Sequence, residues 1–151
     1  MILQPAQNVQ NIPIVQEVIL KATVSEVWNA LTDKGEMRKW YFDLDEFAPE
    51  EGFEFQFIAG EEGKTMYKHI CRIISVIPHE KLVYSWQYEG YPGDSEVRFE
   101  IFAEKDHTRL KLTHAGLESF PEANPDFAKE NFEAGWTQIL NDSLKHYLEN
   151  S

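Results

Sequence analysis

The sequence has one cysteine, Cys71, among its 151 residues. An intrachain disulfide needs two cysteines and a four-cysteine zinc site needs four, so this chain can form neither by itself. The neighbouring positions 70, 73 and 74 are all isoleucine. This setting predicts a small buried hydrophobic side chain at Cys71 rather than a reactive thiol.

Positive charge is also scarce, because 14 Lys and Arg residues stand against 26 Asp and Glu residues and the net charge is -12. Nucleic acids and anionic membrane surfaces bind cationic faces, so the balance argues against both partners. No stretch approaches the roughly 18 continuous apolar residues of a membrane span. The first residues, MILQPAQNVQNIP, lack the basic and apolar parts of a signal peptide. We expect a soluble cytoplasmic protein.

The chain does have enough apolar material for a core, with 42% hydrophobic and 13% aromatic residues. This composition is typical of globular rather than disordered proteins. At this length we expect one domain over residues 1–151, with a loose polar segment at residues 1–12.

The first elements are predicted from composition and capping signals. Residues 14–21 (IVQEVILK) are rich in β-branched side chains and predict a strand. Thr23 and Glu26 then fit a capping box at the start of a helix, and Asp33 with Glu36 repeats the pattern for a second short helix. The apolar positions of the two helices are Val24, Val27, Trp28 and Leu31, then Met37 and Trp40.

From Gly52 onward, apolar and polar residues alternate with the period of half-buried strands. Short segments containing glycine, proline or aspartate separate these runs. The alternating runs are 53–57, 65–76, 82–86, 97–101 and 110–114. Successive strands with short connections predict an antiparallel meander with one buried face.

The C-terminal part reads as a long helix that Asn124 can cap and for which Pro125 suits the first turn. Its apolar stripe consists of Phe132, Trp136, Ile139, Leu140, Leu144, Tyr147 and Leu148. A stripe of this length needs a large apolar surface opposite it, which the sheet supplies. The predicted fold class is therefore α+β, with two short helices after the first strand and a long C-terminal helix on the sheet.

Four motifs in this order resemble the START/Bet v 1-like superfamily, and within it the AHSA1-like family of Hsp90-ATPase-activator homologues. The motifs are VSEVWNALTD at 24–33 followed by Trp40, HEKLVYSW at 79–86, LTHAGL at 112–117, and GWTQILNDSLKHYLE at 135–149. The resemblance implies a helix-grip fold, in which a curved antiparallel sheet wraps around the C-terminal helix and a cavity. It departs from the common pattern at Val24, where a proline is frequent, and in the segment KWYFDL.

The sequence does not match the motifs of a phosphate-binding loop, a metal site or a nucleophilic catalytic set. GEEGKT at 60–65 ends like a phosphate-binding loop, but Ile58 stands where the first glycine belongs and strands flank the segment, so we predict a hairpin loop. The five histidines form no metal-binding spacing, and no serine or cysteine is placed to act with a His–Asp pair. We expect no metal, no other cofactor and no catalytic set.

The candidate site is the aromatic inner face of the sheet and the helix opposite. His114 alternates with Leu110 and Leu112, so it points inward. It is either a core histidine with a hydrogen-bonded partner, or a polar anchor or general base for a ligand. Trp28 has a structural role, whereas Trp40 lies at the expected rim. The predicted ligand-binding residues are Trp40, Phe42, Phe55, Phe57, Tyr84, Trp86, Phe99, His114, Phe132 and Trp136.

These features lead to three hypotheses about function. The first is a binding module that holds a small hydrophobic or aromatic ligand between the sheet and the C-terminal helix. The second, implied by the resemblance, is a chaperone-accessory module that interacts with an Hsp90-type partner. The third is a cyclase or hydrolase that uses His114 as a base. The resemblance also allows a homodimer.

Overall fold

The computed structural model describes residues 12–60 and 64–150, and its centre is a six-stranded sheet with the order β1-β6-β5-β4-β3-β2. Every neighbouring pair of strands is antiparallel, so the predicted meander is confirmed. The strands are β1 (Ile14–Leu20), β2 (Glu54–Gly60), β3 (Met66–Ile77), β4 (Lys81–Tyr88), β5 (Ser95–Glu104) and β6 (His107–Ala115).

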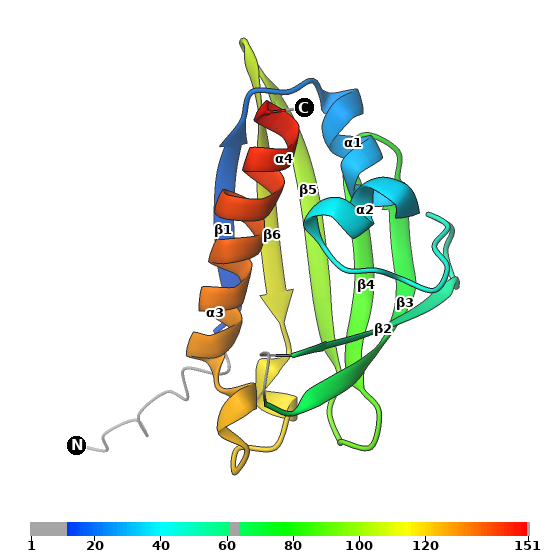
Figure 1. Cartoon of the computed structure of the whole chain (residues 1–151), viewed down its shortest axis with the longest axis vertical. Helices are drawn as coiled ribbons and strands as arrows, with labels where there is room; N and C mark the ends of the chain where they lie inside the picture. Colours follow the sequence, from blue (N-terminus) through cyan, green and yellow to red (C-terminus); the bar gives the residue numbers. More distant parts are fainter. Residues whose placement is uncertain (1–11, 61–63, 151) are drawn as a thin grey trace, which may run out of the picture.

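The helices gather on one face of this curved sheet (Figure 1). The C-terminal helix contacts β1, and α1 contacts both β5 and the end of that helix. The helical elements are α1 (Val24–Thr32), α2 (Lys34–Trp40), η2 (Leu117–Ser119), η3 (Pro125–Phe127), α3 (Lys129–Thr137), the π-helical η4 (Gln138–Leu144) and α4 (Lys145–Glu149). This is the α+β helix-grip architecture that the sequence predicted.

The capping box at the start of α1 forms as predicted. The Glu26 amide donates to Thr23 Oγ1 at 3.1 Å, and the Thr23 amide donates to Glu26 Oε1 at 2.9 Å. Both groups would otherwise be free backbone donors at a helix start, where the side chains satisfy them reciprocally. The box therefore fixes the point at which the chain leaves β1 and turns into α1.

Replacing Thr23 by alanine is expected to lower the free energy of unfolding by about 1 kcal/mol, because the Glu26 amide loses its acceptor. Urea unfolding followed by circular dichroism measures the change. Ser25→Ala is the matched control, since Ser25 is an exposed residue of the same first turn. Equal stabilities for the two variants would contradict a stabilising box.

The second cap differs from the prediction in one half. Asp33 Oδ1 accepts from the Gly35 amide at 2.8 Å and so caps α2. Glu36 does not complete the box, because its Oε1 instead accepts from the Tyr147 hydroxyl at 2.9 Å. The carboxylate thus joins α2 to α4 across the molecule.

The C-terminal helix begins later than the sequence indicated. Asn124 does act as a cap, with its Oδ1 accepting from the Asp126 amide at 3.0 Å, but it caps only the short turn η3. Ala128 is extended, with ψ 141°, and α3 begins after it. The Asn131 side chain donates to the Pro125 carbonyl at 2.7 Å, an oxygen that also accepts from the Ala128 amide at 3.1 Å, and so ties α3 to the η3 turn.

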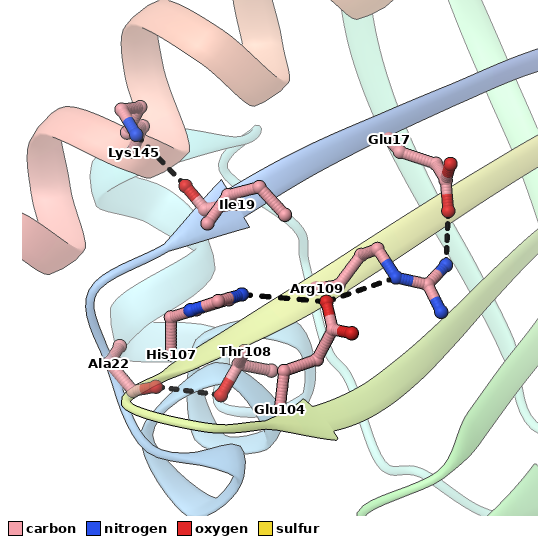
Figure 2. Close-up of polar contacts among 8 residues, drawn as sticks. All are labelled: Glu17, Ile19, Ala22, Glu104, His107, Thr108, Arg109 and Lys145. Carbon is pink, nitrogen blue, oxygen red and sulfur yellow. Dashed lines mark hydrogen bonds and ion pairs between the residues drawn. The ribbon is translucent and has the colours of Figure 1, made fainter.

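Polar contacts fasten the C-terminal helix and the α1 connection to the β1 end of the sheet (Figure 2). Lys145 Nζ donates to the Ile19 carbonyl at 2.8 Å, and Thr108 Oγ1 donates to the Ala22 carbonyl at 2.7 Å. Charged side chains link β1, β5 and β6 through contacts of Arg109 with Glu17 and Glu104, and of Glu104 with His107. These contacts tie β1, β5 and β6 to one another and to the C-terminal helix.

Candidate functional site

A cleft of about 950 Å³ lies between the sheet and the C-terminal helix, on the β2–β4 side. Its walls come from the end of α2, the strands β2 to β4, the η3 turn and the helix from α3 into η4. The lining residues are Trp40, Tyr41, Phe42, Ala59, Gly60, Lys64, Thr65, Tyr67, His69, Trp86, Tyr88, Pro125, Asp126, Asn131, Phe132, Ala134, Gly135, Trp136, Gln138, Ile139 and Ser143.

Aromatic rings pack face to face at the sheet side of the cleft. The Phe57 ring stacks on Phe42 and on His69, each at a centroid distance of 4.4 Å and an interplanar angle of 13°. Trp86 meets His69 edge-on at 4.9 Å and approaches Trp136 at 5.6 Å. These contacts hold the rings in fixed orientations, so the wall is rigid as well as apolar.

Five of the predicted ligand-binding residues line the cleft: Trp40, Phe42, Trp86, Phe132 and Trp136. Trp40 is held there by a hydrogen bond from its Nε1 to the Ala30 carbonyl at 2.8 Å. The other five are buried outside the lining, and they are Phe55, Phe57, Tyr84, Phe99 and His114. The structure thus brings all ten predicted residues together in one region, half at the cleft surface and half in the packing behind it.

His114 lies in a closed chain of hydrogen bonds. The Trp136 indole N–H donates to His114 Nδ1 at 3.0 Å, and His114 Nε2 lies 2.9 Å from Ser95 Oγ. The Ser95 hydroxyl donates its single proton to the Trp86 carbonyl at 2.8 Å, so it must accept from a protonated Nε2. Every N–H and O–H in this series of hydrogen bonds has an acceptor only when His114 is neutral and carries its hydrogen on Nε2.

Burial reinforces this assignment by lowering the pKa of His114 to about 3. A second ring proton would also face the Trp136 N–H, which has no acceptor capacity. Both nitrogens of His114 are engaged by protein groups, which matches the core-histidine alternative. The arrangement leaves neither nitrogen available to take a proton from a ligand while these contacts last.

His69 lines the cleft, although the sequence did not single it out. Its Nδ1 lies 3.0 Å from the Tyr67 carbonyl, and its side chain is 6% exposed. Burial lowers the pKa of His69 to about 4, against the opposing influence of the Tyr67 and Phe57 carbonyls. A signal was present, because His69 is two positions before Cys71 in β3 and shares its buried face.

Three tyrosines of the lining were also missed as site residues. Tyr41 stacks near Trp136 at 6.2 Å and 17°, and its hydroxyl lies 2.6 Å from that of Tyr84. The Tyr88 hydroxyl accepts from the Trp86 indole at 2.9 Å. Tyr67 lines the cleft from β3. The irregular segment after α2 offers no periodicity from which the orientation of Tyr41 could be predicted.

Polar side chains hold one edge of the mouth together. The Tyr67 hydroxyl donates to Asp126 Oδ2 at 2.6 Å and accepts from Asn124 Nδ2 at 3.2 Å. These bonds join β3 to the η3 turn. The cleft thus combines aromatic side chains with polar ones that can orient a ligand, as sites for small organic molecules do.

The described residues form no metal cluster, no exposed thiol and no membrane-spanning helix. Across residues 12–60 and 64–150, no group of three His, Cys, Asp or Glu side chains could hold a metal ion. Cys71 is fully buried, and burial raises its thiol pKa. No helix in the same ranges is long and apolar enough to cross a membrane.

Comparison with models of known protein families identifies the family of this chain. The family described as Activator of Hsp90 ATPase homolog 1-like protein matches residues 21–149. The chain belongs to this AHSA1 family. No curated protein gave a significant match to this AHSA1-like chain.

Solved structures share the AHSA1-like fold. DynU16, from the dynemicin biosynthetic locus, has a TM-score of 0.71 at 22% identity over 91% of this chain and 47% of its own, so this chain spans about half of it. CalU16 from Micromonospora echinospora gives 0.67 at 27% identity over 90% of this chain and 75% of its own. CV1439 from Chromobacterium violaceum gives 0.74 at 22% over 91% and 96%.

Proposed function

We propose that this AHSA1-like chain binds a small hydrophobic or aromatic molecule in the cleft between the sheet and the C-terminal helix. The observation that carries the proposal is the cleft itself, which measures about 950 Å³ and has aromatic walls. Sites for small organic molecules are typically roughly 300–1,000 Å³, with mainly apolar linings and a few polar groups. The volume and the aromatic part of the lining both suit such a ligand.

The binding energy would come chiefly from burial of apolar ligand surface against rigid rings. Phe42 and Trp86 offer faces or edges from the sheet side, and Phe132 and Trp136 do so from the helix. Because the stacked contacts described above already fix these rings, little side-chain entropy is lost when a ligand enters.

The helix beside the cleft supports the same interpretation. Its π-helical segment η4 contributes Gln138, Ile139 and Ser143 to the lining. π-helical segments are rare in proteins, but those that occur are often found at functional sites. Their wider turn alters which side chains face a neighbouring element. Here the π-helical turn brings three side chains of η4 to the cleft.

The two other hypotheses have less support from the described residues. A chaperone-accessory role follows from the family description alone. A catalytic role was assigned to His114, whose two nitrogens are engaged by Ser95 and Trp136. The ligand-binding proposal is therefore the one that the geometry favours.

Filling the cleft from Gly135 tests the proposal. A β-carbon at Gly135 would have nothing within 4 Å, so a larger side chain can enter the cleft without displacing the core. Gly135→Leu is expected to weaken binding of the neutral fluorescent probe N-phenylnaphthylamine by about tenfold or more. It should not destabilise the fold, because leucine is a better helix former than glycine.

Thr137→Leu is the matched control, since Thr137 is exposed on the same helix and lies outside the lining. It adds the same side chain without filling the cleft and should leave probe affinity unchanged. Fluorescence titration measures affinity, and urea unfolding checks that both variants are folded. Equal probe affinity in the wild type and Gly135→Leu would refute the cleft as the binding site.

A further inference from the structure

Two tyrosine hydroxyls meet beside the cleft, which Tyr41 lines. Tyr41 comes from the segment after α2 and Tyr84 from β4, and their oxygens lie 2.6 Å apart. Each hydroxyl carries one proton, but a single hydrogen bond between them uses only one of the two. The second proton therefore needs another acceptor.

The protein supplies no such acceptor within the part of the chain that the structure describes. Within residues 12–60 and 64–150, the bond between Tyr41 and Tyr84 is the only hydrogen bond that either hydroxyl makes. Both phenols keep their protons, because burial raises the pKa of Tyr41 and of Tyr84 well above the usual value. One O–H donor of the pair is consequently left over.

Burial decides which of the two hydroxyls keeps the free proton. Tyr84 is 1% exposed and lies outside the cleft lining, whereas Tyr41 is half-buried and lines the cleft. If Tyr41 donated to Tyr84, the spare proton of Tyr84 would be enclosed without an acceptor, which is costly. This difference in burial favours Tyr84 as the donor to Tyr41, which leaves the Tyr41 proton for an acceptor in the cleft that Tyr41 lines.

We propose that the Tyr41 hydroxyl is a hydrogen-bond donor for a carbonyl oxygen of the ligand, and that Tyr84 is the residue that positions it. This inference rests on the proposed function and names the ligand chemistry: an apolar ring system that carries a carbonyl group. The donated bond from Tyr84 polarises the Tyr41 hydroxyl and strengthens it as a donor. The net charge of -12 favours a neutral carbonyl over an anionic group.

A matched pair of ligands tests the assignment. Acetonaphthone and ethylnaphthalene, substituted at the same ring position, share the ring system and a two-carbon side chain, but acetonaphthone alone carries a carbonyl acceptor. Displacement of N-phenylnaphthylamine gives a Kd for each. In Tyr41→Phe, the Kd of acetonaphthone divided by that of ethylnaphthalene should rise by about three- to tenfold, the usual effect of one neutral hydrogen bond.

Tyr84→Phe distinguishes the proposed donor, Tyr41, from the residue that positions it, Tyr84. The Tyr41 hydroxyl remains in that variant, so the Kd ratio should rise by less than in Tyr41→Phe. Tyr147→Phe is the control, because its hydroxyl bonds to Glu36 outside the cleft, and the ratio should stay at the wild-type value. Urea unfolding confirms that each variant is folded.

The outcomes separate this inference from the proposed function. If both compounds bind the wild type and Tyr41→Phe leaves the Kd ratio unchanged, the donor assignment is wrong while ligand binding in the cleft stands. If Tyr84→Phe raises the ratio as much as Tyr41→Phe does, Tyr41 is not the donor by itself and the assignment also fails. If neither compound nor the probe binds the folded wild type, the proposed function fails and the inference fails with it.

Discussion

Replacing Trp136 by alanine is expected to lower the free energy of unfolding by about 3–5 kcal/mol. The indole is 2% exposed and packs against Trp86 and Phe99, with centroid distances of 5.6 and 6.0 Å. The substitution also removes the N–H that satisfies His114 Nδ1. Since a domain's whole stability is typically about 5–15 kcal/mol, the loss should be plain in urea unfolding followed by circular dichroism.

Trp136→Phe separates the two causes. It keeps a large ring but removes the indole N–H, so it should cost about 1–3 kcal/mol through the unsatisfied nitrogen of His114. Since Trp136 lines the cleft, probe affinity should change in the alanine variant as well. A loss below 1 kcal/mol in Trp136→Ala would contradict the packing role, and unchanged affinity would contradict the ligand contact.

The free energy of unfolding is expected to fall by about 4 kcal/mol between pH 7 and pH 5 through His69 and His114 alone. Burial lowers their folded-state pKa values to about 4 and about 3, while the unfolded value is about 6.5. The unfolded chain therefore binds more protons than the folded chain below pH 6.5. Stability is fully present above that pH and is lost as the pH falls toward the folded-state values.

His69→Phe tests this pH dependence. The variant removes one of the two buried histidines, so the loss between pH 7 and pH 5 should be smaller than in the wild type by about 2 kcal/mol. Urea unfolding at pH 7, 6 and 5 measures it. Thr23→Ala is the control: it lowers stability without altering a histidine, so it should keep the wild-type pH dependence. The contribution of the carboxylates to that dependence should also be the same in this variant as in the wild type. An unaltered slope in His69→Phe would show that this histidine is not held neutral by the fold.

The sequence predicted the elements whose signals are local. Alternation placed Tyr84 and His114 on the buried face, and the spacing of Thr23 and Glu26 predicted a cap that the structure shows in both halves. The helix stripe also placed Trp136 against the sheet. These predictions succeed because period and capping depend on residues within a few positions of one another.

The features that the sequence missed depend on residues far apart in the chain. Glu36 bonds to Tyr147, 111 positions away, and so leaves its local capping partner. The Tyr41–Tyr84 pair spans 43 positions and begins in an irregular segment. Alternation likewise tells which rings face inward but not whether they fill the interior, because that depends on how the curved sheet meets the helix.

The direction of the hydrogen-bond chain through His114 restricts which residues can replace one another in related sequences. An indole can only donate and a backbone carbonyl can only accept, so the order from Trp136 to the Trp86 carbonyl cannot be reversed. Position 95 must accept from one side and donate to the other, which suits a hydroxyl. A relative that lacks the indole would leave an imidazole at position 114 without its donor. The two positions are therefore expected to change together during evolution, although 22 residues separate them.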